Sequence, residues 1–428
     1  MAQRHRVPCL LVLLAGSILA LAPQVAGAWG RGHGWIRVWA VGRLPARQTE
    51  AFGPERLAAL TTKYLGIQDA YAGGKHPELA PYCTVPDVRV SLHDVNPPEA
   101  TFHAVQWYLE QVCRNWQAGQ HDEAMKYLGV LCHWCEDPGS LSAHSSPVDE
   151  ATLRQLIPPP ASLENHNYLY GAGWIGLEKN VGLDDLAYRP QLLGGTIREA
   201  AALITREQRA VQRHAAGLIV PALLGRLEDD PKRLDAAIGA TLNRTARFVA
   251  DVLYTAGCLA QGSVDPGEAQ SLSRQQLTRW IAEPVRTRAS QPYYVVSHLV
   301  GQSLDARRAL HPLQLPGAQG PEPVAFGWGM GTPCRLEYAL ALGGVYKRFT
   351  ARVGLHPTAG PKGKVVFSVK LDGRPTGCVT LAAGQMPAPL AVSLPEQPVI
   401  RLTLEAKAEA GSEPSDNLAV WAEPWLLR

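Results

Sequence analysis

Residues 196–228 read TIREAAALITREQRAVQRHAAGLIVPALLGRLE, and their pattern indicates the fold class of the first part of the chain. Its apolar residues, among them Ile197, Ile204 and Val211, recur at the three- and four-residue spacing of one helical face. Pro221 stands late in the stretch, where it is expected to kink or interrupt the helix. The stretch therefore predicts a long amphipathic helix.

Helical spacing continues on both sides of that stretch, from residue 29 to about residue 262. Strand signals are scarce over this range. The sequence therefore predicts an all-α helical bundle as the first domain, covering residues 29–262. Its other expected helices lie at residues 54–72, 98–117, 122–135 and 232–259.

The pattern changes after residue 262. Residues 263–322 form a mixed, proline-rich connecting segment, and the runs after it alternate apolar and polar residues with a period of two. Turn signals such as Asp372-Gly373 separate these runs. The alternation predicts a β-sandwich over residues 323–427. Its expected strands are 345–355, 364–371, 378–382, 390–394 and 399–406.

The N-terminus has the pattern of a secretory signal peptide. Arg4 and Arg6 precede an apolar run from Cys9 to Ala22, and small residues follow up to Ala28. We expect residues 1–28 to be removed after Ala28, and the mature protein to be secreted or held in the cell envelope. The apolar run is shorter than the roughly 20 residues that span a bilayer, and no later segment is both long and uncharged. The mature chain is therefore expected to have no transmembrane segment.

Charge and cysteine content narrow the function classes. The formal net charge is +3, and the expected signal peptide removes two arginines and no acid, so the mature chain is nearly neutral. Near-neutrality argues against tight, nonspecific binding of polyanions. The chain has eight cysteines, and an odd number remains once Cys9 leaves with the signal. At least one thiol then stays unpaired, and a chain of this length needs no disulfide scaffold to bury a core.

One predicted helix ends in a pair of residues that suit a metal. His133 and Asp137 are four residues apart, so both side chains project from one helical face. Their nitrogen and oxygen ligands suit zinc, and His144 can add a nitrogen from the following loop. Cys132 and Cys135 flank His133, but a second Cys-x-x-Cys is missing, so we expect them to be small buried residues. Taken alone, such a pair is more often a simple ion pair or a helix cap than a metal site.

Further stretches extend this pattern over most of the helical region. They are WGRGH at 29–33, SLHD at 91–94, QHDEAMKYLG at 120–129 and NRTARFVADVLY at 243–254. Together with the helical pair, they resemble the zinc-dependent phospholipase C and single-strand-specific nuclease superfamily. Mature chains of that superfamily begin with a tryptophan whose α-amino and carbonyl groups bind zinc. The resemblance thus links export to metal binding, because cleavage after Ala28 would free the amine of Trp29.

The resemblance implies a cluster of up to three zinc ions. An aspartate upstream of His93 is implied as catalytic base and ligand; Asp87 is the candidate, and Asp69 is the alternative. In such proteins a metal-bound water attacks phosphorus, so the implied activity is hydrolysis of a phospholipid or another phosphodiester. The implied metal ligands are Trp29, His33, His93, His133, Asp137, His144 and His166.

This chain departs from the family pattern in several places. The family has a later His-x-x-x-Glu pair, and here Tyr170 follows His166 where the glutamate is expected, with Glu164 as a substitute from the loop. The interval from Asp137 to His144 is one residue longer than the family pattern leads us to expect. The interval from Trp29 to His33 is one residue shorter than in the nucleases. Two alternatives therefore stay open. One is a single-strand nuclease with the same metals, and the other is a non-catalytic surface or glycan-binding protein with a degenerate metal site.

The C-terminal part carries a second resemblance. The stretches MGTPCRLEY at 330–338, GVYKRFTARVGL at 344–355 and GKVVFSVKLDG at 363–373 resemble the NPCBM module, a carbohydrate-binding β-sandwich of galactose-binding-like fold. The likeness covers residues 323–427 and implies a glycan partner. Trp421 and Trp425 near its end either contact sugar or pack in the core.

Overall fold

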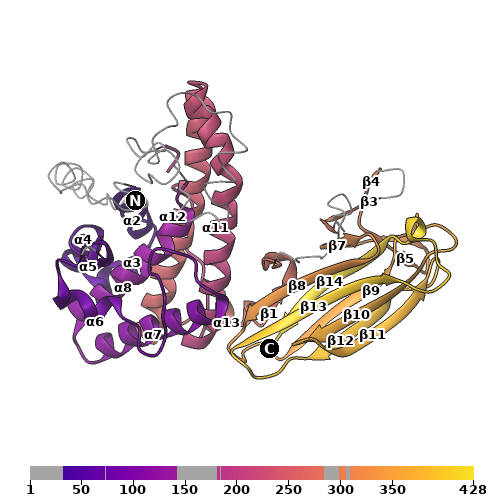
Figure 1. Ribbon diagram of the computed structural model, residues 1–428. Helices are drawn as coiled ribbons and strands as arrows, with labels where there is room; N and C mark the ends of the chain where they lie inside the picture. Colours follow the sequence, from indigo (N-terminus) through magenta and orange to yellow (C-terminus); the bar gives the residue numbers. More distant parts are fainter. Residues whose placement is uncertain (1–31, 73, 142–180, 184, 284–297, 305–308) are drawn as a thin grey trace, which may run out of the picture.

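A computed structural model describes residues 32–72, 74–141, 181–183, 185–283, 298–304 and 309–428. It shows a helical domain followed by antiparallel β-sheets, which lie beside each other in Figure 1, and this confirms the predicted fold class. The expected signal peptide lies outside the described residues. Within the described part, no helix has the length and apolar character needed to cross a membrane.

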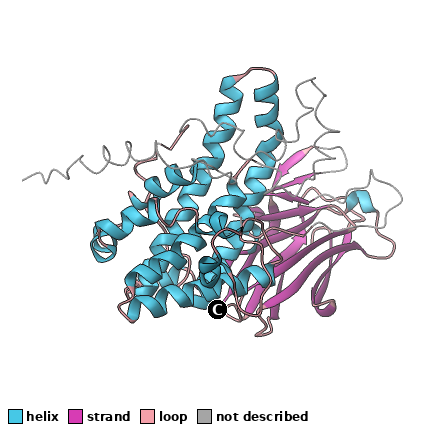
Figure 2. Cartoon of the chain, turned by 60° about the vertical axis from the view of Figure 1, so that its left-hand side comes forward, coloured by secondary structure: helices cyan, strands magenta, loops and turns pink. Residues whose placement is uncertain are grey.

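Two long antiparallel helices form the spine of the helical domain. They are α11 (Ile197–Leu227) and α12 (Pro231–Ala260), and they pack along each other (Figures 1 and 2). The Thr196 side chain caps the start of α11, and Asp230 caps the start of α12. Of the two effects expected of Pro221, a kink or an interruption, the interruption does not occur, because α11 continues through it. Ala222 and Leu223 beyond it are buried, so packing holds the last turn in place.

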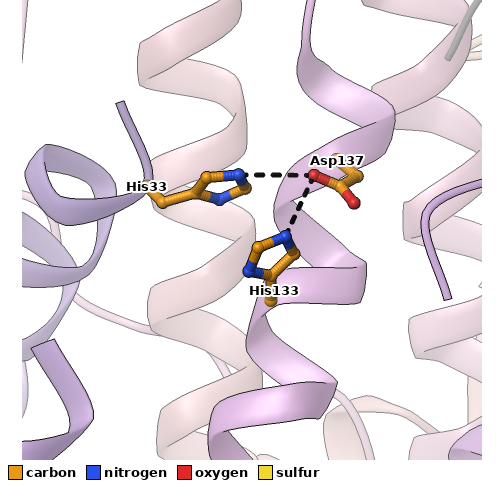
Figure 3. Close-up of side chains that lie close together, drawn as sticks. All are labelled: His33, His133 and Asp137. Carbon is orange, nitrogen blue, oxygen red and sulfur yellow. Dashed lines mark ion pairs between the residues drawn. The ribbon is translucent and has the colours of Figure 1, made fainter. Parts of the chain in front are cut away.

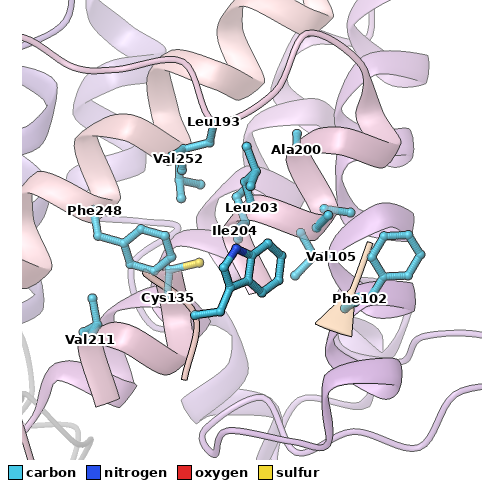
Figure 4. Close-up of a cluster of buried hydrophobic side chains, with 14 of the residues drawn as sticks. Phe102, Val105, Cys135, Leu193, Ala200, Leu203, Ile204, Val211, Phe248 and Val252 are labelled. Atoms are coloured by element: carbon cyan, nitrogen blue, oxygen red, sulfur yellow. The ribbon is translucent and has the colours of Figure 1, made fainter. Parts of the chain in front are cut away.

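A second pair of helices packs against this spine and carries the metal motif. It consists of α7 (Pro98–Gln117) and α8 (His121–Glu136), and α8 continues directly into the 3₁₀ turn η2 (Asp137–Gly139). Buried side chains such as Phe102, Ile204 and Phe248 fill the space between the helices (Figure 4). The shorter elements are α2 (Gly32–Val41), α3 (Ala46–Phe52), α4 (Pro54–Thr61), α5 (Ile67–Ala72), η1 (Pro77–Leu79), α6 (Ala80–Cys83) and α13 (Pro266–Ser271).

The helix expected at residues 54–72 is split into α4 and α5. Thr62 has φ −133° and ψ −81°, which takes the backbone out of the helical conformation at the end of α4. The carbonyls of Tyr64 and Leu65 in the turn after it accept hydrogen bonds from Arg37 and His133 instead of continuing a helix. The break therefore supplies acceptors to the part of the domain where the predicted ligands lie.

The β-sandwich is built from two antiparallel sheets. One has the strand order β12-β9-β14-β7-β2 with β1 added to β14, and the other has the order β11-β10-β13-β8. Phe349, Phe367 and Trp421 are buried in its core, and the rings of Phe367 and Trp421 meet edge to face at 5.8 Å. The strands are β1 (Arg274–Gln276), β2 (His298–Val300), β7 (Gly327–Met330), β8 (Cys334–Ala341), β9 (Arg348–Leu355), β10 (Lys364–Leu371), β11 (Arg374–Ala382), β12 (Ala388–Ser393), β13 (Val399–Ala408) and β14 (Ala419–Leu427). Two hairpins precede β7: β3 (Gln302–Leu304) with β4 (Leu310–Pro312), and β5 (Gln314–Gly317) with β6 (Gly320–Pro323).

The two domains share a continuous contact. Gly343 has φ +57°, and a Cβ there would lie 2.6 Å from the ring of Phe102 in α7, so this close approach requires glycine. The hydroxyl of Tyr346 donates to the carbonyl of Leu272, 3.1 Å away. The side chain of the last residue, Arg428, pairs with the buried carboxylate of Glu199 at the start of α11. Packing and polar contacts together hold the sandwich against the helices.

Candidate metal centre

Three of the predicted ligands meet inside the helical domain (Figure 3). His33 comes from α2, His133 from the last turn of α8 and Asp137 from the residue that follows α8. The Oδ1 atom of Asp137 lies 3.5 Å from Nε2 of His33 and 3.6 Å from Nε2 of His133. Asp137 keeps helical dihedral angles, φ −53° and ψ −44°, so the four-residue spacing does place it beside His133. All three side chains are buried.

A second group of donor atoms adjoins the first and shares His133. Nδ1 of His93 lies 3.0 Å from Oδ2 of Asp137 and 3.7 Å from Oδ1 of Asp69, and that Asp69 oxygen lies 3.7 Å from Nε2 of His133. The donor atoms of Asp69, His93 and His133 all lie within 4.8 Å of one another. The His93 side chain is 21 % exposed, whereas those of His133 and Asp137 are buried. The cluster is therefore most accessible on its His93 side.

A hydrogen bond orients the ring of each buried histidine, His33 and His133. In both rings it is made by Nδ1, the nitrogen that faces away from Asp137. Nδ1 of His133 donates to the carbonyl oxygen of Leu65 at 2.6 Å. Nδ1 of His33 donates to the carboxylate of Glu136 at 2.6 Å. Each Nε2 is then left with its lone pair directed toward Asp137. This is how proteins orient histidine metal ligands, by fixing the proton on the other ring nitrogen.

His93 is held by a short loop whose side chains bond to the loop's own backbone. Asn96 accepts from the amide of Ser91 at 2.9 Å and donates to the Ser91 carbonyl at 2.7 Å. The indole of Trp134 in α8 donates to the carbonyl of Asp94 at 3.0 Å, which ties the loop to the helix that carries His133. The loop can therefore present His93 at a fixed place without belonging to a helix or strand.

Burial shifts the pKa values of the cluster in directions that matter for metal binding. It lowers the pKa values of His33 and His133 well below the usual range, so both rings are neutral near pH 7. It also raises the pKa of Asp137 to about 7, against the opposing effect of His93. Burial alone would lower the pKa of His93, but its hydrogen bond with Asp137 and the charges of Asp137, Asp69 and Asp94 raise it. A cation bound here would have to displace the hydrogen bond between His93 and Asp137.

These residues fit a zinc ion by their chemistry. Nε2 of His133 is fully buried and meets no hydrogen-bond partner among the described residues. A buried polar atom without a hydrogen bond costs about 1–3 kcal/mol, so such atoms are rare unless something else satisfies them. Imidazole nitrogens combined with carboxylate oxygens are a common zinc ligand set.

The sequence-predicted site residues have different fates. The structure brings together His33, His93, His133 and Asp137. It places Asp69, the alternative carboxylate, in the cluster, while Asp87 is exposed in a turn with φ 59° and belongs to neither donor group. The assignments of Trp29, His144 and His166, and the question of Glu164 and Tyr170, fall on residues outside the described part. Metal ligation by all these residues stays a prediction.

Two charged residues that the sequence did not single out lie beside the cluster. Glu136 and Arg37 are both completely buried and form an ion pair with 2.6 Å between Nε and Oε1. Their signal in the sequence was a single charge within an apolar helical run: Arg37 stands in GWIRVWAV, and Glu136 follows LCHWC. Cys132 and Cys135 are buried as expected, and burial raises the pKa of the Cys132 thiol to about 12.

A family model described as the NPCBM/NEW2 domain matches residues 289–427. The chain therefore carries an NPCBM domain at its C-terminus, and the resemblance seen in the sequence there is confirmed. The match starts before residue 323, and the domain boundaries themselves stay predictions. No curated protein is significantly similar to this chain in sequence.

Solved structures resemble parts or most of the chain at low identity. The CBM51-2 and INT domains of Clostridium perfringens ZmpB align with 36% of this chain at 17% identity and a TM-score of 0.29, and this chain covers only 31% of that one. A CBM51 from Clostridium perfringens GH95, in complex with methyl-galactose, aligns with 36% of this chain and 99% of its own length at 16% identity and a TM-score of 0.29. Alpha toxin from Clostridium absonum aligns with 95% of this chain and 99% of its own length at 11% identity and a TM-score of 0.32. Scores this low say nothing about function.

Proposed function

We propose that the protein is an exported, zinc-dependent phosphodiester hydrolase of the phospholipase C type, with a glycan-binding module at its C-terminus. One observation carries the metal part of the proposal. His33 and His133 come from segments about a hundred residues apart, and both direct Nε2 at the same oxygen of Asp137. Each ring is fixed through its other nitrogen. A core that needed only packing would not gather these groups.

The described residues suggest two neighbouring ion positions. His33, His133 and Asp137 would hold one ion, and Asp69 and His93 would hold a second beside it. Trp29, His144 and His166 are the proposed further ligands. Bound zinc supplies a water of lowered pKa and stabilises negative charge on phosphoryl oxygens.

Asp69 is better placed than Asp87 to act as the base. Its Oδ1 lies 3.7 Å from both Nδ1 of His93 and Nε2 of His133, on the more accessible side of the cluster. A carboxylate there would accept a proton from a water that enters beside His93. The buried rings of His33 and His133 would keep bulk water away from the opposite side.

The C-terminal domain is proposed to bind a glycan, and the NPCBM match supports this. Trp421 is completely buried between the sheets, so it belongs to the core. Trp425 is half-buried, with Arg274 4.8 Å above its ring and Phe326 against its edge. These contacts place Trp421 in the core and Trp425 against Arg274 and Phe326, so we propose that the sugar is held elsewhere on the sandwich.

Turnover by the protein produced with its signal sequence tests the enzyme part of the proposal. We expect hydrolysis of a chromogenic phosphocholine ester, lost on zinc removal and in His133→Asn. His76→Asn is a matched control, because His76 is an exposed histidine of the same domain that pairs with Glu78 outside both donor groups. Turnover of single-stranded DNA instead would favour the nuclease, and zinc binding without either activity would favour a non-catalytic binding protein. Turnover that persists in the metal-free protein would contradict the proposal.

A further inference from the structure

The Arg37–Glu136 pair stands behind His33, on the side away from Asp137. We infer that Glu136, fixed by Arg37, is a positioning residue that sets the ring orientation and ligand strength of His33. This inference rests on the proposed metal binding at His33, His133 and Asp137. It gives a role to two buried charges that the proposed ligand set does not use.

Arg37 is anchored so that it can hold Glu136 in a single place. Its guanidinium donates to the carbonyls of Leu60 at 3.0 Å, Tyr64 at 3.3 Å and Gly129 at 2.7 Å. These carbonyls come from the end of α4, the turn after it and the middle of α8. The remaining direction is taken by Glu136, whose Oε1 lies 2.6 Å from Nε of Arg37. Each of the three guanidinium nitrogens of Arg37 thus donates to at least one of these groups.

Gly129 makes this anchor possible. A Cβ at position 129 would lie 2.7 Å from the carbonyl oxygen of Tyr64, closer than side chains tolerate. Only glycine lets α8 approach the turn after α4 so closely. The approach brings the carbonyls of Gly129 and Tyr64 within reach of the same guanidinium. The close approach at Gly129 therefore supplies two of the carbonyls that hold Arg37, and Arg37 in turn holds Glu136.

Glu136 connects this anchor to the metal centre. Its Oε2 accepts from Nδ1 of His33 at 2.6 Å, and His33, Arg37 and Glu136 are all buried. A carboxylate that accepts the outer N–H of a histidine fixes the tautomer, fixes the ring plane and makes the inner nitrogen a stronger metal ligand. Glu136 also directly precedes Asp137, so a single turn of chain supplies one ligand and orients another.

A purely structural ion pair would behave differently from a positioning pair. If the pair only fills the core, its removal changes the stability of the metal-free protein but leaves zinc affinity alone. If Glu136 positions His33, zinc affinity falls even where stability is kept. A buried ion pair replaced as a whole by apolar residues of similar size often costs no stability, so the two effects can be separated.

The test uses the full-length protein, stripped of metal and titrated with zinc against a competing chelator. In Arg37→Met/Glu136→Met, both charges are replaced by long apolar side chains, and we expect the zinc affinity to fall about 10- to 100-fold while metal-free thermal stability stays close to wild type. Glu136→Gln keeps an acceptor for His33 and is expected to lose less affinity. Cobalt(II) substituted for zinc should show an altered visible spectrum in the double variant.

Glu199→Gln is the matched control. Glu199 is also a buried glutamate paired with an arginine, Arg428, but neither residue belongs to the metal cluster. This variant should lower stability and leave zinc affinity unchanged. Wild-type affinity and an unchanged cobalt spectrum in both Glu136 variants would overturn the inference while leaving the proposed function intact. A wild-type protein that binds no zinc would overturn both.

Discussion

Asp137 in the helical domain and Glu405 in the sandwich are both buried carboxylates, yet their surroundings differ. Glu405 on β13 meets the Nζ atoms of Lys370 at 2.9 Å and Lys407 at 3.3 Å. Burial opposes its charge, but these lysines outweigh it and the pKa of Glu405 is lowered. Burial raises the pKa of Asp137 to about 7, and the hydrogen bond and charge of His93 offset this only in part. The sandwich pairs its buried carboxylate with lysines, whereas the helical domain surrounds its buried carboxylate with histidines.

The largest expected effect comes from removing the oxygen that both histidines face. In Asp137→Asn the amide cannot replace a carboxylate as a zinc ligand, so zinc content should drop and turnover of the phosphocholine ester should fall on the order of 10³-fold, since metals supply several kcal/mol of transition-state stabilisation. Metal analysis and steady-state kinetics check this. If the Asp137→Asn protein keeps its zinc, Asp137 is not a metal ligand, and its contrast with Glu405 fails.

The next effect concerns the sandwich core. Trp421→Ala removes a completely buried indole that contacts Phe349 and Phe367, and should destabilise the protein by about 3–5 kcal/mol. Chemical denaturation measures the loss. The folded fraction should keep the zinc content of wild type, because the indole packs against strand residues and belongs to neither donor group. Loss of zinc in folded Trp421→Ala would mean that the domains depend on each other more than their contacts indicate.

Metal removal should lower the thermal stability of the protein through the helical domain, which holds the proposed ligands. A ligand present at 100 times its dissociation constant stabilises the folded state by about 2.7 kcal/mol, so zinc at that excess should raise the thermal midpoint of stripped protein measurably. In His133→Asn the same addition should leave the midpoint unchanged. Equal shifts in both proteins would indicate zinc bound elsewhere.

The smallest expected effect is that of Glu405→Gln. Its lysine partners are partly exposed, so loss of the charge should cost at most about 1 kcal/mol. The folded pKa of Glu405 lies below its unfolded value, so its contribution is present above about pH 4 and is lost as pH falls further. Unfolding measured from pH 7 to pH 3 should show a weaker acid dependence in the variant. An identical slope in both proteins would contradict the assignment of a lowered pKa.

Local sequence patterns predicted where helices and strands lie. They did not predict which elements contact each other. The helix at 98–117 and the strand at 364–371 match α7 and β10, because their apolar periodicity is uninterrupted. Strand β8, CRLEYALA, was missed because leucine, alanine and glutamate favour helices, and only pairing with β13 makes it a strand. Strand β14 was missed where Glu423 takes a positive φ and the register shifts.

In the candidate site, too, local spacing predicted some residues, whereas others depend on tertiary contacts. The His133–Asp137 pair follows from four-residue helical spacing and needed no tertiary information. That His33 and His93 lie beside this pair was expected only from the family resemblance. Both residues stand on other segments of the chain, which local sequence patterns cannot place. Glu136 and Arg37 could not be placed from sequence, since their partners Leu60, Tyr64 and Gly129 become neighbours only after α4 breaks before α5 and α8 packs on the break.

Zinc-edge X-ray measurement on crystals of the protein, produced with its signal and purified without chelator, tests the metal centre most directly. We predict an anomalous peak bounded by His33, His133 and Asp137, with nitrogen ligands at about 2.0–2.1 Å. We predict its loss in His133→Asn crystals. A wild-type map without a metal peak at these residues, with His33 and His133 closed onto Asp137 by hydrogen bonds, would contradict the central claim.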